Sequence, residues 1–212
     1  MKKNLKNTVE KKLSYESSFK QKIRIKKMIC FWFIIDLLAY KIKKIAELYK
    51  KIIGEEYRKE IKEFNLSNAK KILHVGAGSY PLTALILSEI DNVDIVTIDN
   101  NSKSVELADK VIKREKLQDR IKVENGNATR YPLDGFDTII ISGCSVPKIK
   151  ILDHVFKNIQ PNCRVIVREA YNDDDSMIDY IKSYTGISFI KRTSSTPLSG
   201  FNWKSFYFKK ID

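Results

Sequence analysis

Cysteine and histidine are scarce in this sequence. Its 212 residues include three cysteines, Cys30, Cys144 and Cys163, and two histidines. The cysteines are odd in number and show no C-x-x-C spacing, so the sequence indicates neither a disulfide framework nor a zinc site. His74 and His154 have no partners at metal-ligand spacing, and we interpret both as structural. We expect no metal, and a reducing cytoplasm as the compartment.

A long hydrophobic run is also missing. The most apolar stretch, residues 28–40, spans 13 residues and contains Asp36, whereas a helix needs about 20 apolar residues to cross a bilayer. The stretch lies too far from the N-terminus, between flanks too mixed in character, for a secretory signal. The sequence therefore predicts a soluble protein without a transmembrane segment.

Basic residues are abundant, but mainly in the N-terminal third. The formal net charge is +13, which by itself favours phosphates or an anionic membrane surface as partners. Residues 1–70 contain 19 Lys and Arg against 8 Asp and Glu, whereas residues 71–212 contain 20 against 18. The part from residue 71 on is therefore nearly neutral.

With 43% hydrophobic residues the chain can bury one substantial core.

Residues 1–68 have a helical texture after a start rich in Lys and Asn. Apolar residues between positions 34 and 53 recur mostly at steps of three and four, with lysines between them, as in an amphipathic helix. We expect Gly54 to end that helix and a second, short helix to cover residues 55–63. Residues 1–68 are thus predicted to form a helical cap, and residues 69–212 the main domain.

From Lys71 onward, strand and helix patterns alternate, which is typical of a parallel sheet covered by helices. Residues 136–142 form a continuous branched apolar run, as expected of a strand buried on both faces. The last two strands should form an antiparallel pair at the edge, so we predict an α/β fold with a mostly parallel seven-stranded sheet. The expected strands are residues 71–75, 94–98, 121–124, 136–142, 164–168, 187–191 and 204–209, with helices over residues 82–89, 102–116, 149–159 and 176–184.

The segment that follows the first strand carries the clearest functional pattern. Gly76, Ala77 and Gly78 separate that strand from a helix, so the backbone can approach a ligand closely. Asp99 and Asn100 end the next strand about twenty residues on, where an acidic side chain can accept hydrogen bonds from both hydroxyls of a ribose. A third glycine is absent, which disfavours a pyrophosphate and favours a nucleoside without phosphates. The alternative is a purely structural α/β turn.

This arrangement resembles the class I methyltransferase fold, a Rossmann-like fold that binds S-adenosyl-L-methionine. The resemblance implies that Asn127 and Ala128, after the third strand, meet the adenine; for Asn127 an Asx turn that stabilises the loop is the alternative. Ser142 and Gly143 leave the fourth strand at the carboxyl edge, where ligands of open α/β sheets collect. We expect Cys144 beside them to be a small apolar residue and not a nucleophile.

The residues after the glycines resemble a narrower family. Pro81-Leu82-Thr83, followed by an apolar helix, looks like the nicotianamine synthase signature. Segments 146–148 and 165–171 are similar to archaeal members, and the resemblance covers roughly residues 70–210. It implies a transferase that moves the aminocarboxypropyl arm of S-adenosylmethionine to the amine of a small molecule or amino acid, as in metallophore biosynthesis.

The resemblance also points to residues around the acceptor. A helical N-terminal part covers the cleft in that family, so Glu55, Glu56 and Tyr57 are candidates, on position alone, for taking the proton of the amine. The alternative for both glutamates is that they are solvated acids in the first turn of a helix, with no role in catalysis. Arg168 and Tyr171 follow the fifth strand, and we expect Arg168 either to clamp a carboxylate or to form a structural ion pair.

Tyr80 and Thr83 complete the predicted cofactor site. The ring face of Tyr80 is expected to cover the sulfonium or, alternatively, to pack on the N-terminal helices. The sequence departs from the nicotianamine synthase pattern at Ser79-Tyr80 and at residues 172–175. Both departures bear on which acceptor is used.

Other functions stay open on the sequence alone. A small-molecule methyltransferase would use the same cleft, because both transferable carbons adjoin one sulfonium. A non-catalytic cofactor-binding or membrane-surface module would use the basic, aromatic helix of residues 23–53. Nucleic acid is disfavoured as a partner, because residues 142–145 do not match the Asn/Asp-Pro-Pro-aromatic motif of exocyclic-amine methyltransferases. The short N-terminal region also suggests either that a second subunit completes the cap, in a homodimer, or that the acceptor is small.

Overall fold

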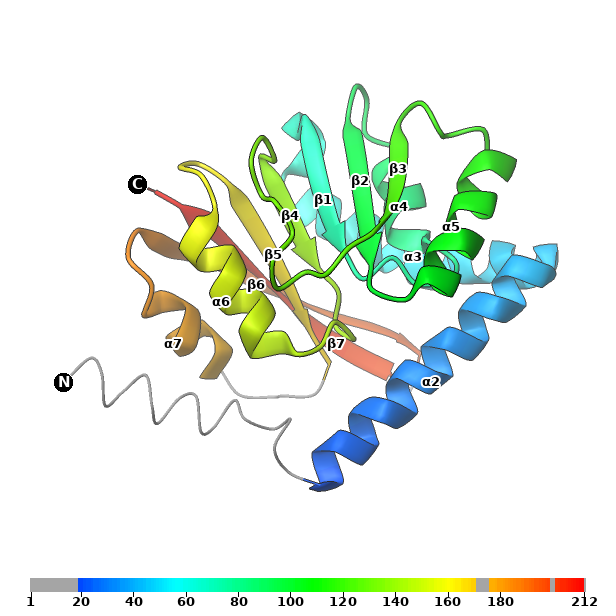
Figure 1. The fold of residues 1–212 in the computed structure, drawn as a ribbon, viewed down its shortest axis with the longest axis horizontal. Coiled ribbons are helices and arrows are strands. Elements are labelled where there is room, and N and C mark those ends of the chain that lie inside the picture. Colours follow the sequence, from blue (N-terminus) through cyan, green and yellow to red (C-terminus); the bar gives the residue numbers. More distant parts are fainter. Residues whose placement is uncertain (1–18, 171–175, 199–200, 212) are drawn as a thin grey trace.

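The computed structural model describes residues 19–170, 176–198 and 201–211, which fold around one seven-stranded sheet (Figure 1). The strand order is β3-β2-β1-β4-β5-β7-β6, in which β1 to β5 are parallel and β7 pairs antiparallel with both β5 and β6. The predicted α/β sheet with an antiparallel pair at its edge is confirmed. The strands are β1 (Lys71–Val75), β2 (Asp94–Asp99), β3 (Ile121–Asn125), β4 (Thr138–Ile141), β5 (Arg164–Glu169), β6 (Ile187–Leu198) and β7 (Phe201–Lys210).

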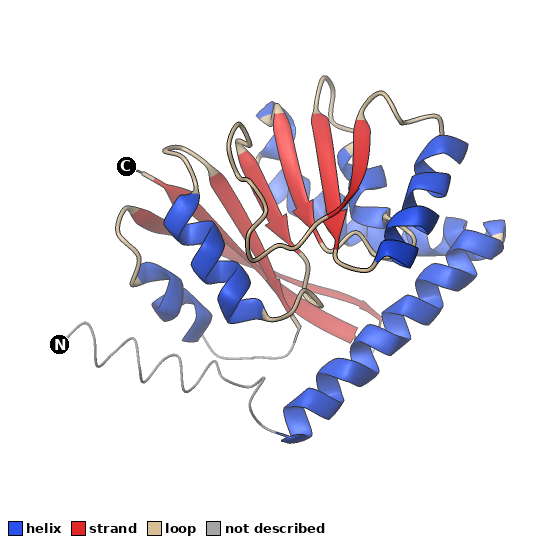
Figure 2. Ribbon diagram, in the orientation of Figure 1, coloured by secondary structure: helices blue, strands red, loops and turns tan. Residues whose placement is uncertain are grey.

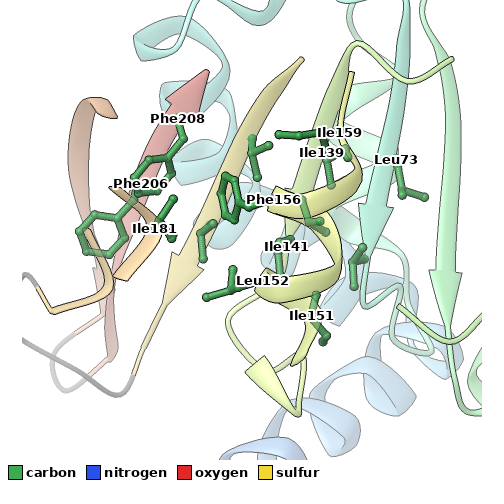
Figure 3. Packing of buried hydrophobic residues seen from close by; sticks show 14 of the residues in the cluster. Leu73, Ile139, Ile141, Ile151, Leu152, Phe156, Ile159, Ile181, Phe206 and Phe208 are labelled. Carbon is green, nitrogen blue, oxygen red and sulfur yellow. The ribbon is translucent and has the colours of Figure 1, made fainter. Parts of the chain in front are cut away.

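Helices cover both faces of this sheet (Figure 2). Side chains of α3 (Lys43–Glu63), α4 (Leu82–Leu87) and α5 (Ser102–Arg114) share one hydrophobic cluster on one face. Those of α6 (Lys148–Asn158) and α7 (Ser176–Lys182) share another on the opposite face. Figure 3 shows the second cluster, in which Leu152 and Phe156 of α6 pack between Ile141 of β4 and Phe208 of β7.

Side chains of the central strands alternate between these two clusters. In β5, Val165 and Val167 belong to the α6 cluster, whereas Ile166 belongs to the α3 cluster. Because side chains alternate along a strand, Arg168 falls on the same face as Ile166, and there it pairs with Glu60 of α3. The alternation of side chains along β5 therefore places the charged side chain of Arg168 against α3.

α2 (Phe19–Lys41) and α3 precede the sheet and meet at Ile42. α2 runs past the carboxyl ends of the parallel strands, whereas α3 lies behind the sheet beside α4 (Figure 1). The predicted helix end at Gly54 is wrong, because α3 continues through that residue. A Cβ at Gly54 would lie 3.0 Å from Cδ1 of Ile86, so this glycine serves the close approach of α3 to α4. None of the described helices is long and apolar enough to cross a membrane.

The observed strand β6 is longer than predicted. It runs from Ile187 to Leu198 and includes Pro197, which the sequence places in a loop. Pro197 lies where the register between β6 and β7 shifts, between Ser195 and Leu198. A proline is tolerated at such an irregularity because it has no N–H to donate to the ladder.

Candidate active site

A cavity of about 1080 Å³ opens at the carboxyl edge of the parallel strands, where open α/β sheets bind their ligands. α2 forms one wall, and the loops after β1, β2, β3 and β4 form others. The volume exceeds the usual range for small-molecule sites, about 300–1000 Å³, so it has room for two small molecules. The structure brings together here all the residues predicted to hold a cofactor: Gly76, Ala77, Gly78, Tyr80, Thr83, Asp99, Asn100, Asn127, Ala128, Ser142 and Gly143.

The glycines after β1 shape the floor of this cavity. Gly76 and Gly78 have φ angles of +91° and +67°, a region that side chains disfavour. A Cβ at Gly76 would lie 2.6 Å from Oγ of Ser145, and one at Gly78 would lie 2.3 Å from Oδ2 of Asp36. The turn therefore has no room for side chains, and its backbone faces the cavity directly.

Asp36 reaches the same turn from α2. Its Oδ2 accepts the N–H of Ser79 at 2.9 Å, and Tyr49 of α3 hydrogen-bonds to the same carboxyl group. Burial raises the pKa of Asp36 from its ordinary 3.8 to about 7, against the lowering effect of these hydrogen bonds. A carboxyl group with this pKa can accept or give a proton near neutral pH, as a general acid or base must.

Aromatic rings line the wall next to this carboxyl group. The ring centroid of Tyr49 lies 6.1 Å from that of Trp32 and 6.0 Å from that of Tyr80, and Tyr57 lies 5.9 Å from Trp203. The hydroxyl of Tyr80 and the Nε1 of Trp203 are buried without a hydrogen-bond partner among the described residues. Buried polar groups are normally paired, so these two are exceptions among the described residues.

A family model described as nicotianamine synthase protein matches residues 45–186, which is more than half of the chain. The chain belongs to the nicotianamine synthase family. The resemblance drawn from Pro81-Leu82-Thr83 is therefore confirmed. No curated protein sequence matches the chain significantly.

Solved structures with the same fold include those of MtNAS. A glutamate-to-glutamine mutant of MtNAS in complex with S-adenosylmethionine has a TM-score of 0.72 and 16% identity, covering 97% of this chain and 84% of that one. MtNAS in complex with MTA and tNA has a TM-score of 0.64 and 18% identity, covering 84% and 69%. The [4+2]-cyclase SpnF has a TM-score of 0.61 and 12% identity, covering 74% and 81%. These likenesses confirm the class I methyltransferase fold, and the cyclase shows that this fold alone does not determine the reaction.

Backbone hydrogen bonds hold the carboxylate of Asp99 at the end of β2. Oδ2 of Asp99 accepts the N–H of Gly78 at 3.0 Å, and its Oδ1 accepts the N–H of Asn101 at 2.9 Å. Both oxygens are thus fixed at the end of β2, and each has a further lone pair for a ribose hydroxyl. The side-chain carbonyl of Asn127 accepts the N–H of Thr129 at 3.0 Å, which forms the Asx turn that the sequence left as the alternative for this residue.

The structure separates the three residues proposed as catalytic from the sequence. Tyr57 lines the cavity, but Glu55 and Glu56 do not. Glu55 pairs with Arg58 at 2.7 Å, and Glu56 pairs with Lys59 at 2.6 Å. Successive residues of a helix point about 100° apart, so α3 cannot present all three side chains to the cavity. Among the described residues, the carboxyl groups that line the cavity are those of Asp36 and Asp99.

Arg168 forms the structural ion pair that the sequence left as one alternative. Its Nη2 lies 2.7 Å from Oε1 of Glu60, its Nη1 donates to Oγ1 of Thr83 at 2.8 Å, and its guanidinium lies 3.9 Å from the ring centre of Tyr57. Both carboxylate and guanidinium are buried. Arg168 therefore fixes the positions of Tyr57 and Thr83 through these contacts. Tyr171, proposed with it for the substrate, lies outside the described residues.

His74 lies beneath the glycine turn as a neutral, structural residue. Its Nδ1 is 2.9 Å from Oγ1 of Thr97 and its Nε2 is 2.8 Å from Oγ of Ser142. Burial lowers the pKa of His74 to about 3, so it carries no charge at neutral pH. No group of His, Cys, Asp or Glu within the described ranges could hold a metal ion.

The substitution Gly78→Ala is expected to weaken S-adenosylmethionine binding about tenfold or more, because the added Cβ would collide with the Asp36 carboxylate. Gly135→Ala is the matched control: its φ is +78°, yet the nearest atom to an added Cβ is Nζ of Lys71 at 4.0 Å. Both variants should lose about 1–2 kcal/mol of stability from backbone strain. Calorimetric titration should show weaker binding only for Gly78→Ala, and equal affinities of the two variants would contradict the assignment of the turn.

Proposed function

We propose that this protein transfers the aminocarboxypropyl group of S-adenosylmethionine to the amine of a small molecule or amino acid. Membership of the nicotianamine synthase family supports this activity. The observation that carries it is the position of Asp36, a buried carboxyl group with a pKa of about 7, directly beside the glycine turn. The product we propose is an amine-linked polycarboxylate of the metallophore type.

Each wall of the cavity has a separate task in this proposal. The glycine turn, Asp99 and Asn127 hold the nucleoside. When bound, S-adenosylmethionine supplies carbons made electrophilic by the adjacent sulfonium. An amine must be neutral to attack such a carbon, so we assign Asp36 to accept the proton of the acceptor ammonium. The half-buried ring of Tyr57, which the guanidinium of Arg168 contacts, limits where the acceptor can lie.

The reaction needs no second subunit in this proposal. α2 and α3 of the same chain supply Asp36, Tyr49 and Tyr57 to the cavity, so in this proposal the N-terminal helices act as the cap without a partner subunit. The cysteines of the described chain are all free thiols. We propose the cytoplasm as the compartment, because such thiols persist under reducing conditions.

Identification of the sulfur-containing product tests this function. Incubation with S-adenosylmethionine and a panel of amines and amino acids is expected to yield methylthioadenosine, together with an acceptor enlarged by the aminocarboxypropyl group. Methyl transfer would instead release S-adenosylhomocysteine. Accumulation of S-adenosylhomocysteine with a methylated acceptor would replace the proposal by a small-molecule methyltransferase on the same fold.

A further inference from the structure

One side of α2 is exposed along its described length. The opposite side carries Ile25, Asp36 and Ala39, which are buried against the rest of the protein. Residues on the exposed side recur at steps of three and four and therefore share one face of the helix. We call this set the outer face of α2: Ile23, Lys27, Cys30, Ile34, Leu38 and Lys41.

Exposed apolar side chains are concentrated on and around this face. Of the eleven large hydrophobic side chains that are exposed among the described residues, eight lie between Ile23 and Leu48. Three of these, Ile29, Phe31 and Phe33, line the cavity, and Ile34, Leu38 and Ile42 form a group outside it. Ile34, Ile42 and Leu48 are 50%, 45% and 55% exposed. Single exposed hydrophobic residues need no explanation, but a contiguous group marks an interaction surface.

The charge of this region is strongly one-sided. Residues 19–48 contain eight Lys and Arg and two acidic residues. The carboxyl group of Asp36 is buried at the glycine turn, and Glu47 of α3 lies 3.9 Å from Lys43. Lys27 and Lys41 of α2 are exposed, as are Lys43 and Lys44 at the start of α3. The outer face of α2 thus presents apolar groups and positive charges with no exposed acid among its described residues.

We propose that the outer face of α2 docks onto an anionic lipid surface. Exposed apolar side chains can enter the membrane interface while neighbouring lysines reach the anionic headgroups. A second copy of the chain fits less well, because a two-fold contact would place these lysines against one another. A nucleic acid would pair with the lysines but would leave Ile34, Leu38 and Ile42 in water.

The same helix borders the mouth of the cavity. Lys26, Phe31 and Phe33 line the cavity and are also exposed to solvent. Docking through the outer face of α2 therefore brings the cavity mouth close to the headgroup layer. This surface role is independent of which group the enzyme transfers.

Vesicle flotation of the full-length protein tests the docking. We expect binding to vesicles in which about a third of the phosphatidylcholine is replaced by phosphatidylglycerol, and no binding to phosphatidylcholine alone. Binding should weaken as salt shortens the Debye length. Replacing three lysines should weaken it about a hundredfold, because each basic residue near an anionic surface contributes about fivefold. The variants are Lys41→Gln/Lys43→Gln/Lys44→Gln and, for the apolar part, Ile34→Gln/Leu38→Gln.

Matched controls carry the same changes elsewhere on the surface. None of the substituted residues lines the cavity, so S-adenosylmethionine binding reports whether each variant is folded. Failure to bind anionic vesicles, or equal losses in test and control variants, would overturn the proposal. A dimer in light scattering that Ile34→Gln/Leu38→Gln dissociates would assign the face to a second copy instead. The controls are Ile190→Gln/Leu198→Gln, on β6, and Lys62→Gln/Lys70→Gln/Lys103→Gln.

Discussion

Asp36→Asn is expected to lower kcat about 10²- to 10⁴-fold, the usual contribution of general acid–base catalysis. Asparagine keeps an oxygen that can accept the N–H of Ser79, the bond that Oδ2 of Asp36 accepts at 2.9 Å. It cannot take the proton of the acceptor ammonium. The carboxylate also accepts the backbone N–H of Tyr80, and the amide has only one acceptor oxygen. The bond to Ser79 is therefore kept while the proposed chemistry is lost. Steady-state formation of methylthioadenosine measures the rate, and calorimetry should show nearly unchanged affinity for S-adenosylmethionine.

Glu56→Gln provides the comparison within the N-terminal helices. Glu56 pairs with Lys59 and does not line the cavity, so its replacement should leave kcat close to that of the wild-type protein. A loss in Glu56→Gln as deep as that in Asp36→Asn would move the base from α2 to α3. A loss of cofactor affinity in Asp36→Asn that accounts for the whole effect would make Asp36 a positioning residue.

The pH dependence supplies a second readout for the same group. Asp36 must be deprotonated to accept a proton, and burial places its pKa at about 7 in the free protein. kcat/KM should therefore fall about tenfold per pH unit below pH 7 and level off above it. The buried His74 has a pKa lowered to about 3 and cannot produce this limb. The limb should disappear from the residual activity of Asp36→Asn.

The sequence contains one indication of the role of Asp36. An acidic residue within the apolar stretch 28–40 argues against a membrane span, but it equally indicates a buried carboxyl group with a purpose. The position of that carboxyl group could not be predicted, because α2 meets the glycine turn only through tertiary packing. Tyr49 was missed for the same reason, since its place on α3 resembles any apolar helix position.

The glycine turn was predictable because its pattern is local. A buried strand, Gly76, Gly78 and an acid at the end of the next strand form within one βαβ unit, whose geometry follows from chain connectivity. Gly54 misled because a glycine near the end of a periodic stretch normally indicates a helix end. Here it reflects contact with Ile86, 32 positions away in sequence, which no local pattern reveals.

Glu60→Gln is expected to lower the free energy of unfolding by about 3–5 kcal/mol, because it leaves the buried guanidinium of Arg168 without its counter-charge. Glu60 is 3% exposed and Arg168 is 3% exposed. Nε and Nη2 of Arg168 both donate to the Glu60 carboxylate, and Oγ of Ser205 donates to it as well. Denaturant unfolding measures the loss. Glu63→Gln is the matched control on the same helix, because its pair with Lys191 is exposed and exposed pairs contribute little.

The double variant Glu60→Leu/Arg168→Met distinguishes the charge from the packing. Removing both charges together takes away the uncompensated ion, and apolar side chains of similar size can fill a buried site at little cost. Its stability should therefore be well above that of Glu60→Gln. Its kcat should fall, because Tyr57 loses the guanidinium that lies 3.9 Å from its ring centre. A double variant as unstable as Glu60→Gln would mean that the ion pair contributes through its shape and hydrogen bonds to Thr83 and Ser205, and not through the balance of charge.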